Sequence, residues 1–237
     1  MFKIGVTERG DAGLDFSWID KLYSANIIIS KNLNDTLIDN LIKNKDKIIF
    51  HMTCTGYGNT ILEPNVPNVL YNRKQIDKLI DLGFPVKQIV LRIDPIIPTD
   101  KGMSTVELIL NMFKDSNIKR VRFSFLEVYS HIKPRFIKAG LSLPYNNFVA
   151  PLNMRVKAIR ILKLWQYDYE FESCAEDTPY QLGCVSQKDL DILGLTEHIK
   201  VSGYQRKGCL CANNKTELLN NKYKCTHGCL YCYWKDK

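Results

Sequence analysis

Short β-rich runs alternate with helical patterns along most of this 237-residue chain, and this alternation restricts the folds that it can adopt. The expected strands lie at residues 3–7, 26–30, 48–54, 88–93, 119–126, 168–174 and 198–202. Parallel strands need long crossover connections, which helices usually supply. The sequence therefore predicts an α/β fold, a partial (βα) barrel of six to seven parallel strands.

Helix start signals support the segments between these strands. Asn34 or Asp35 is expected to cap the first helix. Ser104 and Glu107 have the spacing of a capping box, which predicts a helix start at that point. Pro151 is expected to open a later helix, because proline is favoured in the first turn.

Side chains alternate across a strand, so each expected strand has two faces. One face is mostly apolar and is expected to meet the helices: Ile4, Val6, Ile27, Ile29, Ile89, Leu91, Ile93, Val121, Phe123, Phe125, Ile199 and Val201. The other face becomes polar toward the C-terminal strand ends, as at His51 and Arg122. A closed barrel fills its interior with bulky apolar side chains. The polar face therefore predicts an incomplete barrel with a wet cavity, and the alternative is an ordinary sheet with some exposed polar residues.

Active sites of barrel proteins lie at the C-terminal ends of the strands. Charged and polar residues follow several expected strands here. We expect the catalytic groups to be Arg92, Asp94, Glu127 and Glu176, and the cofactor-binding groups to be Arg9, Thr53 and Glu172. A long connection, 127–150, follows one such end, and it is either a functional loop or a variable surface excursion.

Cys225, Cys229 and Cys232 have the spacing Cys-x3-Cys-x2-Cys, with Tyr231 before the last cysteine. Three thiolates this close together can hold three irons of a [4Fe–4S] cubane and leave the fourth iron without a protein ligand. An open metal position suits a catalytic cluster. The spacing predicts an iron–sulfur site, and the alternative is a structural zinc site that also uses His227 or another cysteine.

Four more cysteines complete a second donor set: Cys174, Cys184, Cys209 and Cys211. Four thiolates make a closed iron–sulfur cluster or a tetrahedral zinc site. We expect all four to gather on the barrel rim, where they would hold a second [4Fe–4S] cluster. Cys54 is left over and is expected to be a small buried apolar residue.

The chain has a net charge of +8, and residues 200–237 hold eight Lys/Arg against two acidic residues. Such a segment can contact a polyanion such as nucleic acid. It can equally be a solvated tail, or it can balance anionic thiolate-bound clusters.

The expected organisation is a barrel at 1–203 and a cysteine-rich iron–sulfur tail at 204–237 that packs on the C-terminal rim. No apolar run of about 18 residues and no signal-peptide pattern occurs, so we expect a cytoplasmic protein that contacts no membrane. Eight cysteines in such a chain indicate metal binding or catalysis before disulfides.

Several segments together carry a resemblance to known proteins. They are Thr55-Gly56-Tyr57, residues 62–67, residues 92–96, Cys174-Ala175-Glu176, Gln205-Arg206, Cys209-x-Cys211 and residues 225–233. These segments are similar to a family of uncharacterised bacterial proteins, some labelled DNA-repair-photolyase-like, with a C-terminal Cys-x3-Cys-x2-Cys motif. The motif itself resembles that of the radical S-adenosylmethionine (SAM) superfamily.

The resemblance implies a radical-SAM-like fold in which the cluster motif has moved to the C-terminus. In that superfamily the open iron binds SAM, an electron cleaves the sulfonium, and a 5′-deoxyadenosyl radical abstracts hydrogen from a substrate. The implied cofactors are [4Fe–4S] clusters and SAM, and the implied partner is a reductant such as a flavodoxin or ferredoxin. The substrate is unknown, and nucleic acid or a nucleotide-like molecule is slightly favoured.

Two alternatives stay open at this point. The Gly-Gly-Glu segment that the superfamily uses for the SAM amino group is absent after the second strand, where Ser30-Lys31-Asn32 stands. That difference favours an iron–sulfur protein without SAM, for electron transfer, redox sensing or direct substrate binding at the open iron. The other alternative is a zinc-stabilised module whose basic tail contacts nucleic acid.

Overall fold

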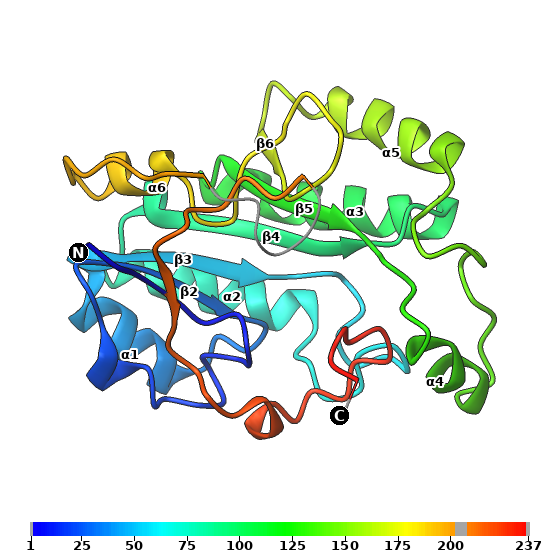
Figure 1. Ribbon diagram of the computed structural model, residues 1–237, viewed down its shortest axis with the longest axis horizontal. Coiled ribbons are helices and arrows are strands. Elements are labelled where there is room, and N and C mark those ends of the chain that lie inside the picture. The colour runs from blue at the N-terminus through cyan, green and yellow to red at the C-terminus, as the bar shows by residue number, and fades with distance from the viewer. Residues whose placement is uncertain (1, 202–207, 236–237) are drawn as a thin grey trace.

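The computed structural model describes residues 2–201 and 208–235, and within them seven parallel strands form one sheet in the order β6-β5-β4-β3-β2-β1-β7 (Figure 1). The strands are β1 (Ile4–Val6), β2 (Ala25–Ser30), β3 (Ile48–Thr53), β4 (Ile89–Ile96), β5 (Arg120–Phe125), β6 (Glu170–Ser173) and β7 (Lys215–Glu217). Consecutive strands from β1 to β6 are neighbours in the sheet. The predicted α/β fold with a parallel sheet is confirmed.

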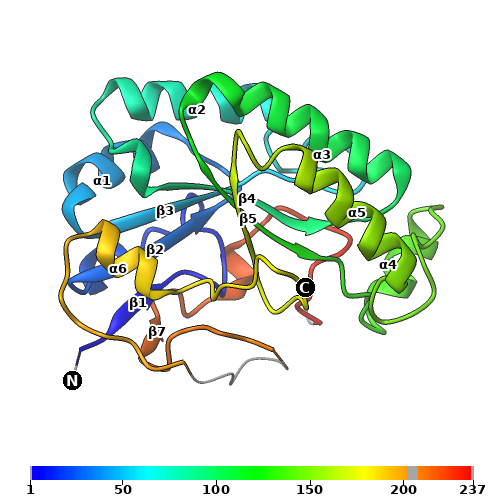
Figure 2. The same cartoon turned by 90° about the horizontal axis from the view of Figure 1, so that it is seen from above.

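Helices cover mainly one face of this sheet. They are α1 (Asp35–Lys43), α2 (Val69–Asp81), α3 (Asp100–Phe113), α4 (Ile132–Lys138), α5 (Leu152–Leu164) and α6 (Gln187–Ile192). Figure 2 shows α1, α2, α3 and α5 on one side of the sheet and α6 on the other. Strands β1 to β6 follow one another in the sheet without a change of direction. Right-handed crossovers between such successive neighbours all lie on the same face of the sheet, which is why most of the helices are found there.

The helices α1 and α3 begin where a side chain accepts a hydrogen bond from a backbone N–H of the first turn. Asn34 caps α1, and its side chain accepts from the Leu37 backbone N–H at 2.9 Å. Thr99 caps α3 in the same way, accepting from the Gly102 N–H at 3.1 Å, so the helix begins five residues earlier than the Ser104 capping pattern predicts. No helix within the described ranges has both the length and the apolar character that crossing a bilayer requires.

The main core lies between the sheet and its covering helices. Phe50, Leu91 and Phe123 meet the helices in one buried cluster, as predicted for β4 and β5. The prediction is wrong for β1 and β2, because Ile4, Val6, Ile27 and Ile29 belong to a second cluster on the opposite face with Val185 and Leu190. Residues 185–193 contribute apolar side chains on that face. They cover the apolar side chains of β1 and β2, which are therefore buried there and not against the helices.

The last expected strand is replaced by a different one. Val201 forms only an isolated bridge with Ala212, and Ser202 lies outside the described residues. The strand that does form, β7, pairs in parallel with β1, with Ile4 opposite Lys215 and Val6 opposite Glu217. The predicted boundary between residues 203 and 204 and the Gln205-Arg206 segment lie outside the described residues.

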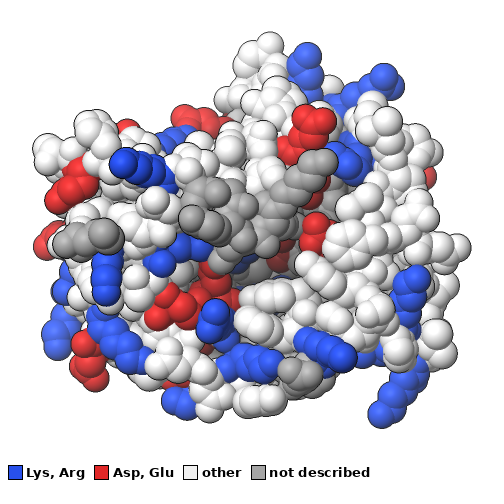
Figure 3. All heavy atoms as spheres, viewed as in Figure 1, with Lys and Arg blue, Asp and Glu red and all other residues white. Residues whose placement is uncertain are grey.

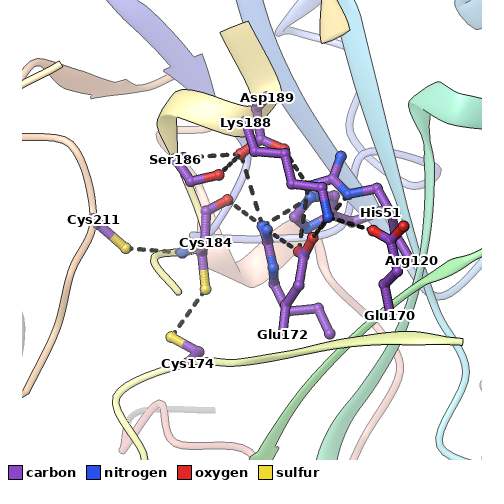
Figure 4. A network of polar contacts seen from close by, with 11 residues as sticks. His51, Arg120, Glu170, Glu172, Cys174, Cys184, Ser186, Lys188, Asp189 and Cys211 are labelled. Atoms are coloured by element: carbon purple, nitrogen blue, oxygen red, sulfur yellow. Dashed lines mark hydrogen bonds and ion pairs between the residues drawn. The ribbon is translucent and has the colours of Figure 1, made fainter. Parts of the chain in front are cut away.

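Two arginines of β5 are buried on the face that α6 covers. Arg120 Nε lies 2.9 Å from Glu172 Oε1, and Arg120 Nη2 lies 2.6 Å from Asp189 Oδ1 of α6. Arg122 also pairs with Glu172. We call Arg120, Arg122, Glu172 and Asp189 the ion cluster, and Figure 4 shows its labelled members converging beside Cys184. The ion cluster therefore connects β5, β6 and α6 beneath the C-terminal edge of the sheet.

Glu172→Gln removes a buried charge that both arginines share, and we expect a loss of about 3–5 kcal/mol in the free energy of unfolding. Glu170→Gln is the matched control on the same strand. Its side chain is 63% exposed and pairs with Lys188, and an exposed pair contributes about 0–1 kcal/mol. Urea unfolding at pH 7 measures both variants, and equal losses would contradict the assignment.

The ion pairs of Glu172 with Arg120 and Arg122 also predict that the stability of the fold depends on pH. Burial alone would raise the pKa of Glu172, but Arg122 and Arg120 outweigh burial and hold this pKa at about 2, below the ordinary 4.5. A lowered carboxyl pKa stabilises the fold above pH 4.5, and the contribution is lost as the pH falls toward 2. The stability difference between wild type and Glu172→Gln should shrink over this interval, as urea unfolding at several pH values would show.

Candidate functional site

A cavity of about 820 Å³ opens at the C-terminal edge of the sheet. Its walls include Val6, Ile29, Thr53, Arg92 and Phe125, from strands β1 to β5, together with Cys225 and residues 227–234. Figure 3 shows a hollow on this side of the molecule with acidic and basic side chains around it. The cavity lies where parallel α/β proteins bind their ligands.

Both cysteine sets reach this cavity. Cys225, Cys229 and Cys232 line it from the C-terminal segment, and Cys174, Cys184 and Cys209 line it from the β6 side. Cys211 packs behind them, and its Sγ accepts a hydrogen bond from the Cys184 N–H at 3.2 Å (Figure 4). The structure thus brings together cysteines that are up to 58 positions apart in the sequence.

The second cysteine set forms a small buried cluster of its own. Cys174, Cys184, Cys209 and Cys211 pack together, and the Cys174 and Cys184 sulfurs are 3.0 Å apart. All eight cysteines of the chain are free thiols. The hydrogen bond to Cys174, together with burial, raises the pKa of Cys184 above its ordinary value. Cys54 lies apart from both sets in the main core, as its sequence pattern indicated.

The donor chemistry of the second set fits a metal centre. Four soft sulfur donors are what iron–sulfur clusters and structural zinc use. In the described part of the chain the sulfurs pack against one another and do not surround a common centre. Two thiolates on a tetrahedral zinc with 2.3 Å bonds lie about 3.8 Å apart, so the Cys174 and Cys184 sulfurs must separate to share a metal.

Residues 225–234, which we call the cysteine loop, are held by side chains from the loop after β1 and the loop after β3. His227 Nε2 lies 2.7 Å from Asp11 Oδ2. Asn65 contacts the loop three times. Its backbone N–H donates to the His227 carbonyl at 3.2 Å, its side-chain amide donates to the Thr226 carbonyl at 2.8 Å, and its carbonyl lies 3.2 Å from His227 Nδ1. His227 therefore serves as an anchor here, between two of the three cysteines.

Tyr231 anchors the centre of the cysteine loop. Its hydroxyl donates to the buried Glu63 carboxylate and accepts from Lys31 Nζ at 3.2 Å. Lys31 also pairs with Glu63, and Thr55 Oγ1 donates to Glu63 Oε2 at 2.7 Å. Burial raises the pKa of Tyr231 well above its usual range, and Glu63 adds to the shift, so the phenol stays a proton donor. This network fixes the aromatic residue that precedes Cys232.

Helix α4 holds the far end of the cysteine loop. Arg135 Nη1 donates to the Cys232 carbonyl at 2.7 Å, and Nη2 donates to the Trp234 carbonyl at 2.6 Å. Figure 1 shows the loop beside α4 and the segment after β3. The cysteine loop is therefore attached on three sides, which gives its three thiols defined positions at the cavity.

Arg92 and Asp94, both predicted as catalytic, lie side by side in the cavity wall. They form an ion pair, and Ser124 Oγ donates to Asp94 Oδ1 at 2.5 Å. Burial would lower the pKa of Arg92, but Asp94 outweighs burial and raises it, so the guanidinium stays charged. Glu127 also lines the cavity, as do the predicted cofactor-binding residues Arg9 and Thr53.

Besides Cys211, two predicted site residues do not line the cavity. Glu172 lies in the ion cluster, because α6 covers its strand at that depth. Glu176 accepts a hydrogen bond from the Phe125 backbone N–H at 2.9 Å and lies 3.8 Å from Arg155. Both carboxylates hold neighbouring strands and helices together.

The polar residues of the site that were not predicted include Asp11, Lys31 and Glu63. Lys31 and Asp11 line the cavity, and Glu63 lies buried behind Tyr231. The one signal for Glu63 in the sequence was its place in the 62–67 segment that carries the family resemblance.

These features define a class: an α/β protein with a parallel sheet and a cysteine-lined cavity at the strand ends. Comparison with protein families places the chain more closely. Residues 21–234 match the model of a domain of unknown function, DUF1848, and the chain belongs to this family. Comparison with the curated proteins found no match. The expected membership in an uncharacterised family is confirmed, and the likeness to radical SAM enzymes stays a prediction.

Tyr231→Phe deletes the hydroxyl that links Glu63 to the cysteine loop, and we expect a loss of about 1–3 kcal/mol in the free energy of unfolding. Tyr233→Phe is the matched control two residues away. Tyr233 is 50% exposed, and its hydroxyl donates to the Glu8 carbonyl, so we expect at most about 1 kcal/mol. Urea unfolding measures both variants, and a larger loss for Tyr233→Phe would refute the anchoring role.

Proposed function

We propose that this protein is an iron–sulfur enzyme of radical SAM type, in which both cysteine sets hold [4Fe–4S] clusters at one substrate cavity. The observation that supports the proposal is the convergence of six cysteines on an 820 Å³ cavity at the C-terminal strand ends. Two structural zinc sites would have no need to share a ligand-sized cavity, whereas a catalytic cluster and its substrate must.

Each cysteine set has a distinct role in the proposal. Cys225, Cys229 and Cys232 supply three ligands and leave one iron open, while the second set supplies four and is closed. The chemistry that a reduced cluster supplies is one electron to the sulfonium of SAM, which breaks a carbon–sulfur bond. A reductant such as a flavodoxin or ferredoxin would provide that electron.

The protein's own residues bind and orient the reactants. The anchors of the cysteine loop fix the open side of the first site, and Arg92 with Asp94 offers hydrogen bonds to a bound molecule. Tyr129 and Trp234 line the cavity with aromatic surface, which reduces access of water to reactive species. The substrate is not assigned; a nucleotide-like molecule or nucleic acid remains the slightly favoured class from the sequence.

A second candidate is an iron–sulfur protein that works without SAM. One observation favours it. Lys31 follows β2, where the superfamily carries a carboxylate for the SAM amino group, and its ammonium lies in the cavity wall near Cys229. This ammonium is paired with buried Glu63 and offers N–H donors, whereas binding an amino group needs an acceptor such as a carboxylate.

Iron content tests the two cysteine sets separately. Anaerobically prepared wild type should hold about eight irons per chain, and Cys229→Ala and Cys184→Ala should each hold about four. Cys54→Ala is the matched control, since Cys54 lies in the main core, and it should keep the wild-type content. Full iron retention in Cys229→Ala would refute the first site, and a colourless protein that retains zinc would favour the zinc-stabilised module.

Electron paramagnetic resonance of the dithionite-reduced protein tests the use of SAM. Addition of SAM should change the wild-type signal, because the cofactor would bind the open iron. The signal of Cys229→Ala, which keeps only the closed cluster, should not respond. A cluster signal in wild type that is indifferent to SAM would support the second candidate.

A further inference from the structure

Two buried polar atoms in the cavity wall have no hydrogen-bond partner among the described residues: Thr53 Oγ1 and Arg92 Nε. Thr53 is 3% exposed, and both side chains line the cavity. A buried donor without a partner costs about 1–3 kcal/mol, so such groups in a folded protein call for a ligand or an ordered water.

The sheet register explains why these atoms lie together. Thr53 at the end of β3 is directly opposite Arg92 of β4. Arg92 is in turn opposite Arg122, and Arg122 is opposite Glu172. The four side chains form a row across one face of the sheet. In this row the Glu172 carboxylate forms ion pairs with Arg122 and with the neighbouring Arg120. Arg122 Nε also has no partner among the described residues, but Arg122 does not line the cavity, so the unused hydrogen-bonding capacity that a ligand can reach is that of Thr53 and Arg92.

The remaining contacts of Arg92 leave part of its guanidinium for a ligand. Its Nη2 pairs with Asp94, which also accepts from Ser124. A guanidinium has five N–H donors in a planar fork, and the edge that carries Nε is suited to carboxylate and phosphate oxygens. Asp94 pairs with Nη2 and so orients the guanidinium, while Nε–H has no partner among the described residues.

This pair of groups lies near the second cysteine set. Arg122, which is directly opposite Arg92 in the sheet, donates to the Cys184 carbonyl at 2.7 Å, and Cys184 lines the same cavity. A molecule held by Arg92 and Thr53 would therefore lie on the side of the cavity next to the second cysteine set.

The geometry points to an anion subsite at Thr53 and Arg92 that holds a carboxylate or phosphate group of the substrate. Arg92 Nε–H and the Thr53 hydroxyl each donate to an oxygen of that group, and Asp94 is the positioning residue for Arg92. The inference rests on the proposed function only in taking the occupant to be the substrate. It narrows the substrate to acidic molecules and adds a role for Thr53.

Isothermal titration calorimetry of the anaerobically prepared protein tests the subsite, with inorganic phosphate and succinate as separate probes. At least one probe should bind wild type, and which of them binds more tightly distinguishes phosphate from carboxylate recognition. Arg92→Gln should weaken binding at least about tenfold, as expected for a lost hydrogen bond to a charged group.

Thr53 offers a conservative pair of variants that leaves Arg92 and Asp94 in place. Thr53→Val keeps the shape and removes the hydroxyl, so it should weaken binding about fivefold, while Thr53→Ser keeps the hydroxyl and should bind like wild type. Equal affinities in all variants, or no binding of either probe to wild type, would overturn the subsite and leave an ordered water as the partner of these atoms.

Iron content of the same samples separates this inference from the proposed function. Iron-loaded protein with binding that is independent of Arg92 and Thr53 would overturn the subsite alone. Protein without iron that binds a probe through both residues would support the subsite and refute the iron–sulfur enzyme.

Discussion

The placement of the cavity depends on the pairing of two buried arginines. Arg120 and Arg122 are 5% and 0% exposed, and a guanidinium at that depth is stable only with carboxylate partners. Those partners come from β6 and α6, so the pairing closes the open face of the sheet below the cavity. Arg122 Nη1 also donates to the Cys184 carbonyl at 2.7 Å, which joins the second cysteine set to the same interaction.

Sequence periodicity predicted the strands well and their faces less well. A period of two identifies which residues share a face, but what covers that face decides whether it meets helices or the cavity side. Ile27 and Ile29 fit the apolar pattern as well as Leu91 and Ile93, yet they pack against the segment around α6. β7 was missed because Lys215-Thr216-Glu217 is short and polar, and its pairing with β1 joins residues more than 200 positions apart.

The sequence predicted those parts of the candidate site that can be recognised from residue type and spacing alone. Cysteines at regular spacing and charged residues at strand ends were found in this way, and most of them line the cavity. The anchors were not found, because an anchor is recognised only with its partner. Glu63 binds Tyr231 across 168 positions, and Asp11 binds His227 across 216. Ser104 shows the same limit locally, since a capping pattern has no effect once Thr99 has already started the helix.

The pairing of β7 with β1 has a consequence for biosynthesis. During translation β1 is made first and its outer edge stays unpaired until residues 215–217 have left the ribosome. An unpaired strand edge is a template for association with other chains, so nascent chains are most prone to aggregate during that interval. The cysteine loop is made after β7. Its three thiols therefore leave the ribosome after β7, whereas the second cysteine set, whose last members precede β7, leaves it earlier.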